Sequence, residues 1–383
     1  MDVTPRSPNQ TKRLLSIDGG GLLGLIPAQA LIAMEKQLND ITGRTAPLCE
    51  RFDLIGGTST GAILAAGLAL GKSAEELSDF YIQLGPEIFD PSFILTRFWH
   101  KYPSGPIEKC LQEKFGATVR LGGPQLKTMI LLITKNATLG NNWLFTNNPG
   151  SRYFACNKDL LLWDIVRASS AAPTYFPPHS INIPDGQGGS NKYEFIDGGV
   201  SSYNNPSLQV FLEATQPEHR LNWPTGTDRL LLISLGTGFD SVGVPQGKAA
   251  RYELLDWARY MIRELMNEAN LQQNVLMHLI GERVPLPSGA PDPALAAAPP
   301  GTPDLKALAH VTGILDSTRL LTYQRITVEF SATRLTQLGL ADIDPARVTE
   351  MDAVDQIDSM RRVGQAVAKE QVHMERLKNF FID

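Results

Sequence analysis

The sequence predicts an α/β fold in which a mainly parallel central sheet is flanked by helices. Short apolar runs typical of buried strands alternate along the chain with longer runs that have helical spacing. With 383 residues, 43% of them hydrophobic, the chain can also bury a large core. The strand-like runs are residues 14–17, 52–55, 127–133, 193–196 and 230–235.

The first strand-like run, residues 14–17, leads into a glycine-rich turn. Residues 18–24 follow with the sequence DGGGLLG, and residues 25–38 then have the spacing of a helix. Glycines between a strand and a helix expose several backbone N–H groups at the helix N-terminus, where these groups can bind an anion. The turn therefore predicts a site for a phosphate or for a tetrahedral oxyanion.

The same turn also fits the pattern G-x-G-x-x-G of dinucleotide-binding folds, through Gly19, Gly21 and Gly24. Two features count against that interpretation. Asp18 places a carboxylate beside the expected pyrophosphate. The position where a ribose-binding acid should end a second strand falls at residues 39–40, at the end of the helical run. Nucleotide binding is therefore the weaker hypothesis.

Ser59 lies in a second strand-to-helix turn. It is the centre of the sequence GTSTG, between the apolar run at 52–55 and a helix-like run at 62–68. In a nucleophile elbow, this pattern exposes a serine hydroxyl beside the positive end of a helix. Gly57 and Gly61 would be needed because a sharp turn leaves no room for neighbouring Cβ atoms. The motif also arises by chance in helices of small residues, so alone it leaves a catalytic and a structural serine open.

Asp197 ends another strand-like run and is followed by Gly198 and Gly199. Catalytic groups lie at strand ends in open α/β sheets. An Asp-Gly turn is also common in any loop, and taken alone that interpretation is favoured. The aspartate becomes informative only together with the other two turns.

In this order, the three turns resemble the patatin-like phospholipases, serine lipid acyl hydrolases that use a Ser–Asp dyad. The resemblance includes a proline-containing block at 168–178, a strand and turn at 232–238 and a segment at 350–353, within residues 14–364. It implies a three-layer fold and a catalytic dyad of Ser59 and Asp197. It also implies an oxyanion hole of backbone N–H groups, from Gly19, Gly20 and Gly21. The further motif residues are Asp18, Gly24, Gly57, Gly61, Gly198 and Gly199.

The chain departs from the family at Leu23, where an arginine or lysine usually stands. A cation there could hold a phosphate head group or brace the glycine turn. Its absence leaves the backbone oxyanion donors in place. It favours neutral or single-chain esters over phospholipids as substrates.

The resemblance implies a hydrolase that cleaves carboxylic esters of phospholipids, lysophospholipids or other acyl glycerolipids through an acyl-enzyme. Its partners would be a lipid or acyl-ester substrate and, transiently, a membrane or micelle surface. No cofactor and no metal are expected. Two alternatives on the same fold remain open, a non-catalytic lipid-binding module and an acyltransferase.

A Ser–Asp–His triad is the competing scheme, because α/β-hydrolases carry these residues in that chain order. It would need a histidine after Asp197. The candidates are His219, His278, His310 and His373, and none lies in a glycine-flanked turn at a strand end. The dyad is therefore the preferred hypothesis.

We expect one catalytic domain at residues 12–383 behind a flexible tail at 1–11. Its motif-bearing core covers residues 14–238. A Pro/Ala-rich loop at 285–303 separates this core from a mainly helical part at 304–383.

Outside the motifs the local patterns predict further elements. Residues 325–330 have the pattern of a strand, and residues 352–380 that of a long charged helix. Residues 141–157 and 183–191 are rich in Asn, Gly and polar residues and predict two loops. Ser169 and its neighbour Ser170 are expected to begin a helix.

Charge and hydropathy exclude other classes of protein. The net charge of −5 gives no broad basic field that could hold nucleic acid. Residues 1–10 lack the apolar stretch of a signal peptide. The longest apolar stretch, residues 54–70, is shorter than the roughly 20 residues that span a bilayer. We therefore expect no transmembrane segment, and a protein that is cytoplasmic or peripheral to a membrane.

An apolar cluster at residues 93–99 is a candidate lid that could dock on lipid. A packed helix is the commoner structure for such a cluster, because large apolar side chains usually belong to a core.

Overall fold

The computed structural model describes residues 11–90, 100–240, 244, 247, 249–284 and 319–382. Four segments lie outside the described residues: residues 1–10 of the predicted tail at 1–11, the candidate lid at 93–99, the Pro/Ala-rich loop at 285–303 and residues 304–318.

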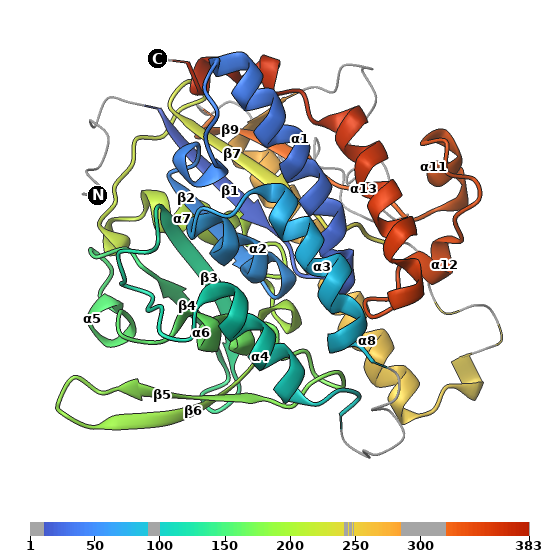
Figure 1. Cartoon of the computed structure of the whole chain (residues 1–383), viewed down its shortest axis with the longest axis horizontal. Coiled ribbons are helices and arrows are strands. Elements are labelled where there is room, and N and C mark those ends of the chain that lie inside the picture. Colours follow the sequence, from blue (N-terminus) through green and yellow to red (C-terminus); the bar gives the residue numbers. More distant parts are fainter. Residues whose placement is uncertain are drawn as a thin grey trace.

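The middle of the molecule is a largely parallel sheet (Figure 1). Its parallel strands lie in the order β3-β2-β1-β7-β9-β8. Every residue of β1, β2, β7 and β9 is buried, and apolar runs predicted the first three of these strands. The bounds are β1 (Lys12–Ile17), β2 (Leu54–Thr58), β3 (Met129–Asn136), β7 (Leu230–Leu235), β8 (Gly281–Arg283) and β9 (Leu321–Ile326).

Antiparallel strands extend the sheet beyond β3. They are β4 (Asn141–Thr146), β5 (His179–Pro184) and β6 (Ser190–Asp197). The predicted loop at 141–157 is therefore wrong, because it contains β4 and the short helix α5 (Phe154–Asn157). The predicted loop at 183–191 reduces to the turn of the β5–β6 hairpin. Cross-strand aromatic packing, such as Trp143 against Tyr193 at 5.4 Å between ring centroids, outweighs the loop-like composition of these segments.

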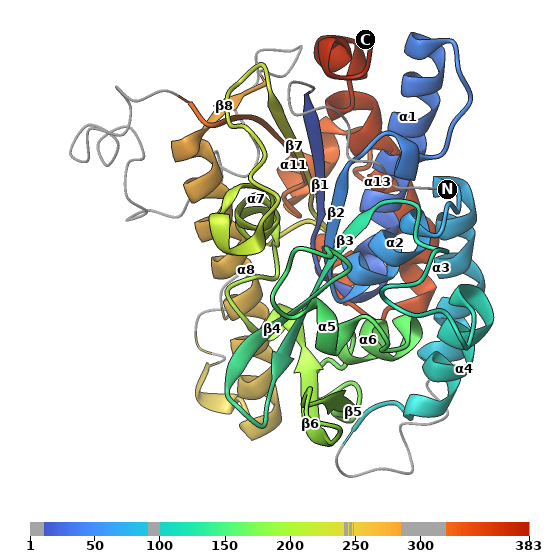
Figure 2. The same ribbon diagram turned by 90° about the vertical axis from the view of Figure 1, so that its left-hand side faces the viewer.

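Helices cover both faces of the sheet, which gives the three layers that the resemblance implied. Figure 2 shows α7 (Ser207–Thr215) and α8 (Leu254–Ile280) on one side. The other side carries α1 (Leu25–Thr42), α2 (Thr60–Ala69), α3 (Ala74–Ile88) and α13 (Ile357–Gln371). Successive residues of a strand point to opposite faces, so Leu14 packs in the core under α7, and Leu15 in the larger core under α1 and α2. The other α-helices in the described ranges are α4 (Ser104–Phe115), α6 (Leu162–Ser169), α11 (Ala332–Gln337) and α12 (Pro345–Val348).

The C-terminal part packs back on the first helix. The predicted strand at 325–330 lies four residues earlier, as β9. The predicted long helix is broken, because α13 ends at Gln371 and a 3-10 segment follows at Met374–Phe380. Gly364 of α13 lies so close to α1 that a Cβ atom there would be 3.0 Å from the Cα of Ile26. This close approach fixes the C-terminal helix against the layer that carries the glycine-rich turn.

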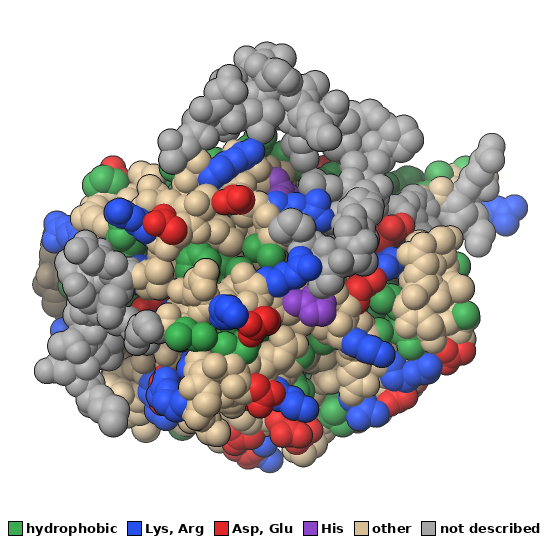
Figure 3. All heavy atoms as spheres, turned by 90° about the horizontal axis from the view of Figure 1, so that it is seen from above, with side chains coloured by type: hydrophobic (Ala, Val, Ile, Leu, Met, Phe, Trp, Pro, Cys, Tyr) green, Lys and Arg blue, Asp and Glu red, His purple; other side chains and the backbone are tan. Residues whose placement is uncertain are grey.

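The surface shows mixed charge. Basic and acidic side chains are interspersed on the face seen in Figure 3, in keeping with the small net charge. Among the described residues, the helices are too short or too polar for any of them to cross a bilayer.

Candidate active site

The pairing of strand β3 brings Ser59 and Asp197 together. Residues 131–133 of β3 pair with both β2 and β4, and residues 134–136 pair with both β4 and β6. A strand has only two edges, so β2 and β6 meet end to end along the same edge of β3. Thr58, the last residue of β2, pairs with Ile133, and Asp197 pairs with the next residue, Thr134. The residue after Thr58 is Ser59, so sheet register alone places the two predicted catalytic residues side by side.

Ser59 stands in a strained turn between β2 and α2. Its backbone has φ 54° and ψ −120°, a region that residues other than glycine rarely occupy. A Cβ atom on Gly57 would lie 2.1 Å from the carbonyl oxygen of Gly61, and one on Gly61 would lie 2.1 Å from that of Ile17. The two glycines of the motif are therefore required sterically, and the turn has the geometry of a nucleophile elbow.

The side chains of Ser59 and Asp197 are joined by a short hydrogen bond. Ser59 Oγ donates to Asp197 Oδ2 at 2.5 Å, and both residues are buried. The other carboxylate oxygen, Oδ1, accepts a hydrogen bond of 2.6 Å from the backbone N–H of Gly199. Burial raises the pKa of Asp197 to about 6, although the hydrogen bonds from Ser59 and Gly199 lower it. An aspartate with this pKa is a stronger base than an exposed one and is still mostly ionised at neutral pH.

Two further residues of α6 hold this pair, and the sequence analysis predicted a role in the site for neither of them. Ser169 Oγ accepts a hydrogen bond of 2.9 Å from the backbone N–H of Ser59 and donates one of 2.6 Å to the carbonyl oxygen of Ile133. Ser169 and Ser170 were expected to begin a helix, but they stand where α6 ends. The structure corrects that prediction, because the function of Ser169 is to bind the elbow rather than to cap a helix.

Arg167 is the second of these residues. Its side chain is buried, its Nη2 donates to the carbonyl oxygen of Pro177 at 3.1 Å, and its guanidinium lies over the ring of Phe176. Burial lowers the pKa of Arg167 to about 10, so it is a cation at neutral pH. Its charge lowers the pKa of Asp197 and favours the carboxylate. The sequence signal was an arginine inside an apolar helical segment, directly before the proline-containing block.

The glycine-rich turn lies next to the dyad. Gly20 and Gly21 line the same cavity as Ser59 and Asp197. Gly19 does not offer its amide to this cavity, because its N–H donates to the carbonyl oxygen of Asn204 at 3.1 Å. Of the three predicted oxyanion donors, Gly20 and Gly21 therefore remain as candidates. Gly21 has φ +60°, and a Cβ atom there would lie 2.5 Å from the carbonyl oxygen of Met351, so only glycine fits.

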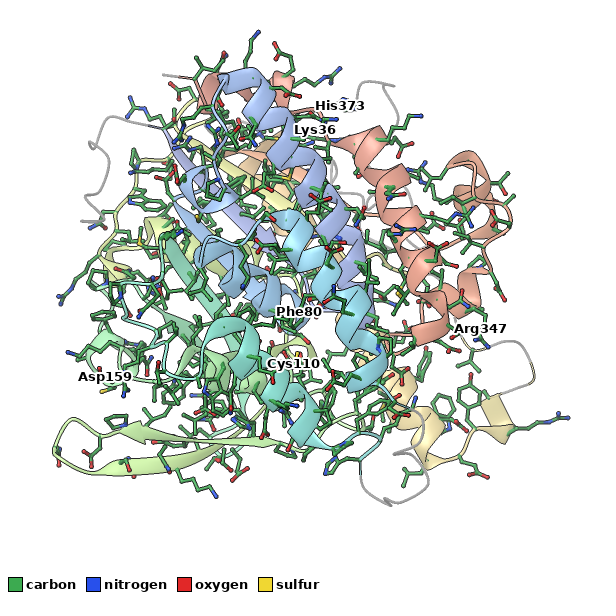
Figure 4. The ribbon with its side chains drawn as sticks, viewed as in Figure 1. Lys36, Phe80, Cys110, Asp159, Arg347 and His373 are labelled. Carbon is green, nitrogen blue, oxygen red and sulfur yellow. The ribbon has the colours of Figure 1, made fainter. Side chains whose placement is uncertain are left out.

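Two cavities in the described part of the chain share several lining residues, and the first of them contains Ser59. The first is narrow and almost entirely apolar, and Figure 4 marks Phe80 on α3 and Cys110 on α4, the helices on one side of it. Its apolar walls include Ile63, Phe80, Ile88, Phe89, Ile107, Phe176, Ile262 and Met266. The second cavity is wider and more polar, and it shares Gly20, Tyr175 and Met351 with the first. The arrangement suits a molecule with one apolar chain and one polar end.

None of the described histidines belongs to this site. The cavity that contains Ser59 is lined by no histidine of the described ranges. His219 Nδ1 lies 2.7 Å from Glu213, His278 packs on Tyr323, and His373 contacts the carbonyl oxygen of Glu370. His310 lies outside the described residues. A triad through a described histidine therefore has no support in this geometry.

Comparison with known proteins identifies the family of this chain. The model of the family described as patatin-like phospholipase matches residues 15–211, which include the glycine-rich turn, Ser59 and Asp197. The chain belongs to the patatin-like phospholipase family. Patatin-15 of Solanum tuberosum is 32% identical over 274 residues, which cover 67% of this chain and 69% of that relative. Patatin-T5 of the same species is 33% identical over 241 residues, 60% of this chain and 61% of the relative.

Another patatin relative shows why the family alone does not decide activity. A protein of Solanum tuberosum named probable inactive patatin-3-Kuras 1 is 33% identical over 261 residues, which cover 64% of this chain and 68% of the relative. Similarity at this level therefore includes a relative whose name marks it as inactive. Activity of this patatin-like chain therefore has to be inferred from the geometry of Ser59 and Asp197.

At Leu23, where this patatin-like chain departs from the family pattern, the structure shows which cation contacts the glycine-rich turn. Leu23 is buried and carries no charge to the glycine-rich turn. Arg325 of β9 reaches this turn instead, with Nη1 donating to Asp18 Oδ1 at 2.9 Å and Nη2 donating to Asp18 Oδ2. The same Nη1 donates to Ser234 Oγ at 2.6 Å. A buried bidentate ion pair with β9, a strand far along the sequence, therefore stabilises the turn.

Proposed function

We propose that this protein is a lipid acyl hydrolase that cleaves carboxylic esters through Ser59 and Asp197. The observation that carries the proposal is the 2.5 Å contact from Ser59 Oγ to Asp197 Oδ2 beside an apolar cavity. A nucleophile in hydrogen-bond contact with a base is the arrangement that covalent catalysis requires. A protein that only binds lipid has no need of a strained, activated serine.

The reaction begins with attack of Ser59 Oγ on the ester carbonyl carbon. Asp197 accepts the hydroxyl proton, because its Oδ2 already receives that hydrogen bond. The negative charge that develops on the carbonyl oxygen is stabilised by backbone N–H groups of Gly20 and Gly21, together with that of Thr60 at the start of α2.

The carbon–oxygen bond to the alcohol then breaks, and Asp197 returns the proton to the leaving alkoxide. An acyl-Ser59 ester remains. A water molecule repeats the sequence. Asp197 removes a proton from this water, the hydroxide attacks the acyl carbon, and Ser59 Oγ leaves and regains a proton. The products are a fatty acid and an alcohol.

The cavities support a glycerolipid as the substrate class, whether a phospholipid, a lysophospholipid or another acyl glycerolipid. The narrow apolar cavity would hold the acyl chain, and the wider cavity the polar remainder. Cations and carboxylates nearly balance in the wider cavity. Lys101 pairs with Asp352 and Arg263 with Asp240, and the further charged lining residues are Arg251, Asp256 and Glu350. Balanced charge favours a neutral or zwitterionic head group over one that is only anionic.

A lipid panel with mass-spectrometric detection of products tests the proposal. Wild type should release fatty acid from at least one glycerolipid, and Ser59→Ala should not. A fluorophosphonate probe should label wild type at Ser59, and absence of labelling on folded protein would make the chain a lipid-binding module. Addition of an alcohol acceptor separates the remaining alternative, because an acyltransferase would yield a new ester instead of free acid.

A further inference from the structure

Helix α8 carries a stripe of large apolar side chains that face solvent. Leu254 is 85% exposed, Met261 59% and Leu265 44%. Three of the six exposed large hydrophobic residues in the described part of the chain thus belong to this helix. They are spaced by seven and four positions, so they lie on one face of the helix. We call Leu254, Met261 and Leu265 the α8 stripe.

The same helix lines the catalytic cavity. Ile262 and Met266 follow Met261 and Leu265 by one position each, and both side chains line the cavity that contains Ser59. One position is about 100° around a helix, so the α8 stripe lies beside the cavity-lining face rather than opposite it. Figure 2 shows α8 at the outer edge of its layer. The exposed apolar face is therefore continuous with the wall of the acyl cavity.

The surroundings of the stripe are aromatic and carry nearly balanced charge. Trp257 packs edge-on against Tyr252 at 5.2 Å and against Tyr260 at 5.7 Å between ring centroids. Tyr and Trp rings, apolar at one end and polar at the other, suit a lipid–water boundary. Charges from residue 251 to residue 268 nearly cancel, since Glu253, Asp256, Glu264 and Glu268 stand against Arg251, Arg259 and Arg263.

We propose that the α8 stripe docks this protein on the surface of a neutral or zwitterionic lipid layer, from which acyl chains pass along Ile262 and Met266 to Ser59. The proposal rests on the proposed function for its account of what enters the cavity. Continuity with that cavity selects lipid as the occupant, and the nearly cancelling charges along this half of the helix give no attraction to an anionic membrane. A second copy of the chain is a poorer occupant, because a stable interface buries about 800 Å² on each partner and three side chains supply only part of that area.

Vesicle flotation with the full chain carrying Ser59→Ala tests the docking without hydrolysis. Phosphatidylcholine vesicles should carry this protein with them. Adding Leu254→Ser, Met261→Ser and Leu265→Ser should lower the bound fraction by at least about tenfold, because the apolar contact area is lost. Leu139→Ser is the matched control, since Leu139 is 53% exposed but lies in the β3–β4 turn, and it should leave binding unchanged. Binding should change little with salt or with added phosphatidylglycerol.

Unchanged flotation of the triple variant would overturn the proposal. So would a salt-sensitive preference for phosphatidylglycerol, which would show that charge directs the docking. Size-exclusion chromatography tests the other occupant. If wild type elutes as a dimer, the triple variant elutes as a monomer and vesicle binding is unchanged, the stripe binds a second copy of the chain.

Activity separates this inference from the proposed function. With Ser59 intact, the triple variant should keep full activity on a short soluble ester and lose activity on vesicles. If neither the triple variant nor wild type hydrolyses any ester while flotation behaves as expected, the docking stands and the hydrolase proposal fails. Circular dichroism and the Tm should match wild type, because the three substitutions remove only exposed side chains.

Discussion

The backbone N–H of Ser59 donates a hydrogen bond of 2.9 Å to Ser169 Oγ, so the last residue of α6 holds the turn that carries the proposed nucleophile. The same hydroxyl donates to the carbonyl oxygen of Ile133 on β3. Ser169 thereby ties three elements together at the point where the serine hydroxyl must be aimed. Because Ser59 has an unfavourable φ, the surrounding contacts are needed to keep it there.

Ser169→Ala should therefore impair both stability and turnover. It leaves two buried backbone groups without partners, and the free energy of unfolding should fall by about 1–3 kcal/mol. The nucleophile loses its anchor, and kcat should fall by up to about 100-fold. Urea unfolding and ester hydrolysis measure the two effects. Ser78→Ala is the control, because Ser78 is a buried serine on α3 that accepts a hydrogen bond from Gln29. It should lose stability but keep kcat, and equal kcat losses in both variants would argue against a specific role for Ser169.

Ser59→Ala and Asp197→Asn should each lower kcat by at least about 1000-fold, because one removes the nucleophile and the other the base.

Asp197→Asn should also change how the free energy of unfolding depends on pH. The pKa of Asp197 is raised from 3.8 to about 6, so the folded state binds a proton more tightly than the unfolded state. Ionisation of Asp197 therefore destabilises the fold progressively as pH rises from about 4 to 6. Asp197→Asn should remove this penalty and stabilise the protein above pH 6 by up to about 3 kcal/mol. Denaturation at pH 4 and pH 8 checks the sign, and equal effects at both values would contradict it.

The pH profile of kcat/KM should fall on the acid side with an apparent pKa of about 6, because protonated Asp197 cannot accept the proton of Ser59. Arg167→Met should move this acid limb to higher pH, since it removes the buried cation that favours the carboxylate. Arg167→Lys should return the limb toward its original position. A lower rate in Arg167→Met without any movement of the limb would assign Arg167 a packing role only.

Loss of the Asp18–Arg325 pair should destabilise the glycine-rich turn. Arg325→Leu leaves the buried carboxylate of Asp18 without its cation, and the free energy of unfolding should fall by about 3–5 kcal/mol. The double variant Asp18→Asn with Arg325→Met should recover part of this loss, because no buried charge remains. Arg362→Leu serves as the comparison, since its pair with Asp342 is at the surface, and it should leave Tm unchanged. If the double variant is less stable than Arg325→Leu, the unpaired charge of Asp18 is not the main cause of the lost stability.

Much of the nucleophile side of the site could be predicted from local sequence. A strand, a serine between glycines and a helix of small residues specify a sharp turn whatever surrounds it, and the structure has that turn at Ser59. The predicted strand at residues 230–235 matches β7 to the residue. Composition was a poorer guide at residues 141–157, where asparagines concealed the strand β4.

Contacts between distant segments could not be predicted in the same way. Ser59 and Asp197 are 138 positions apart, and Asp18 and Arg325 are 307 apart. Nothing in the local pattern around Arg167 or Ser169 connects either residue with the elbow. The Gly19 amide also appeared free from the sequence, whereas Asn204 occupies it in the fold.

The sequence by itself determined the turns, because glycine sterics, strand propensity and helix starts depend on residues within a few positions of each other. Only the tertiary structure decided which carboxylate the serine meets, which cation offsets which buried charge, and which face of α8 stays exposed. These depend on sheet register and layer packing, where a shift of one residue on β3 would turn Asp197 to the other face.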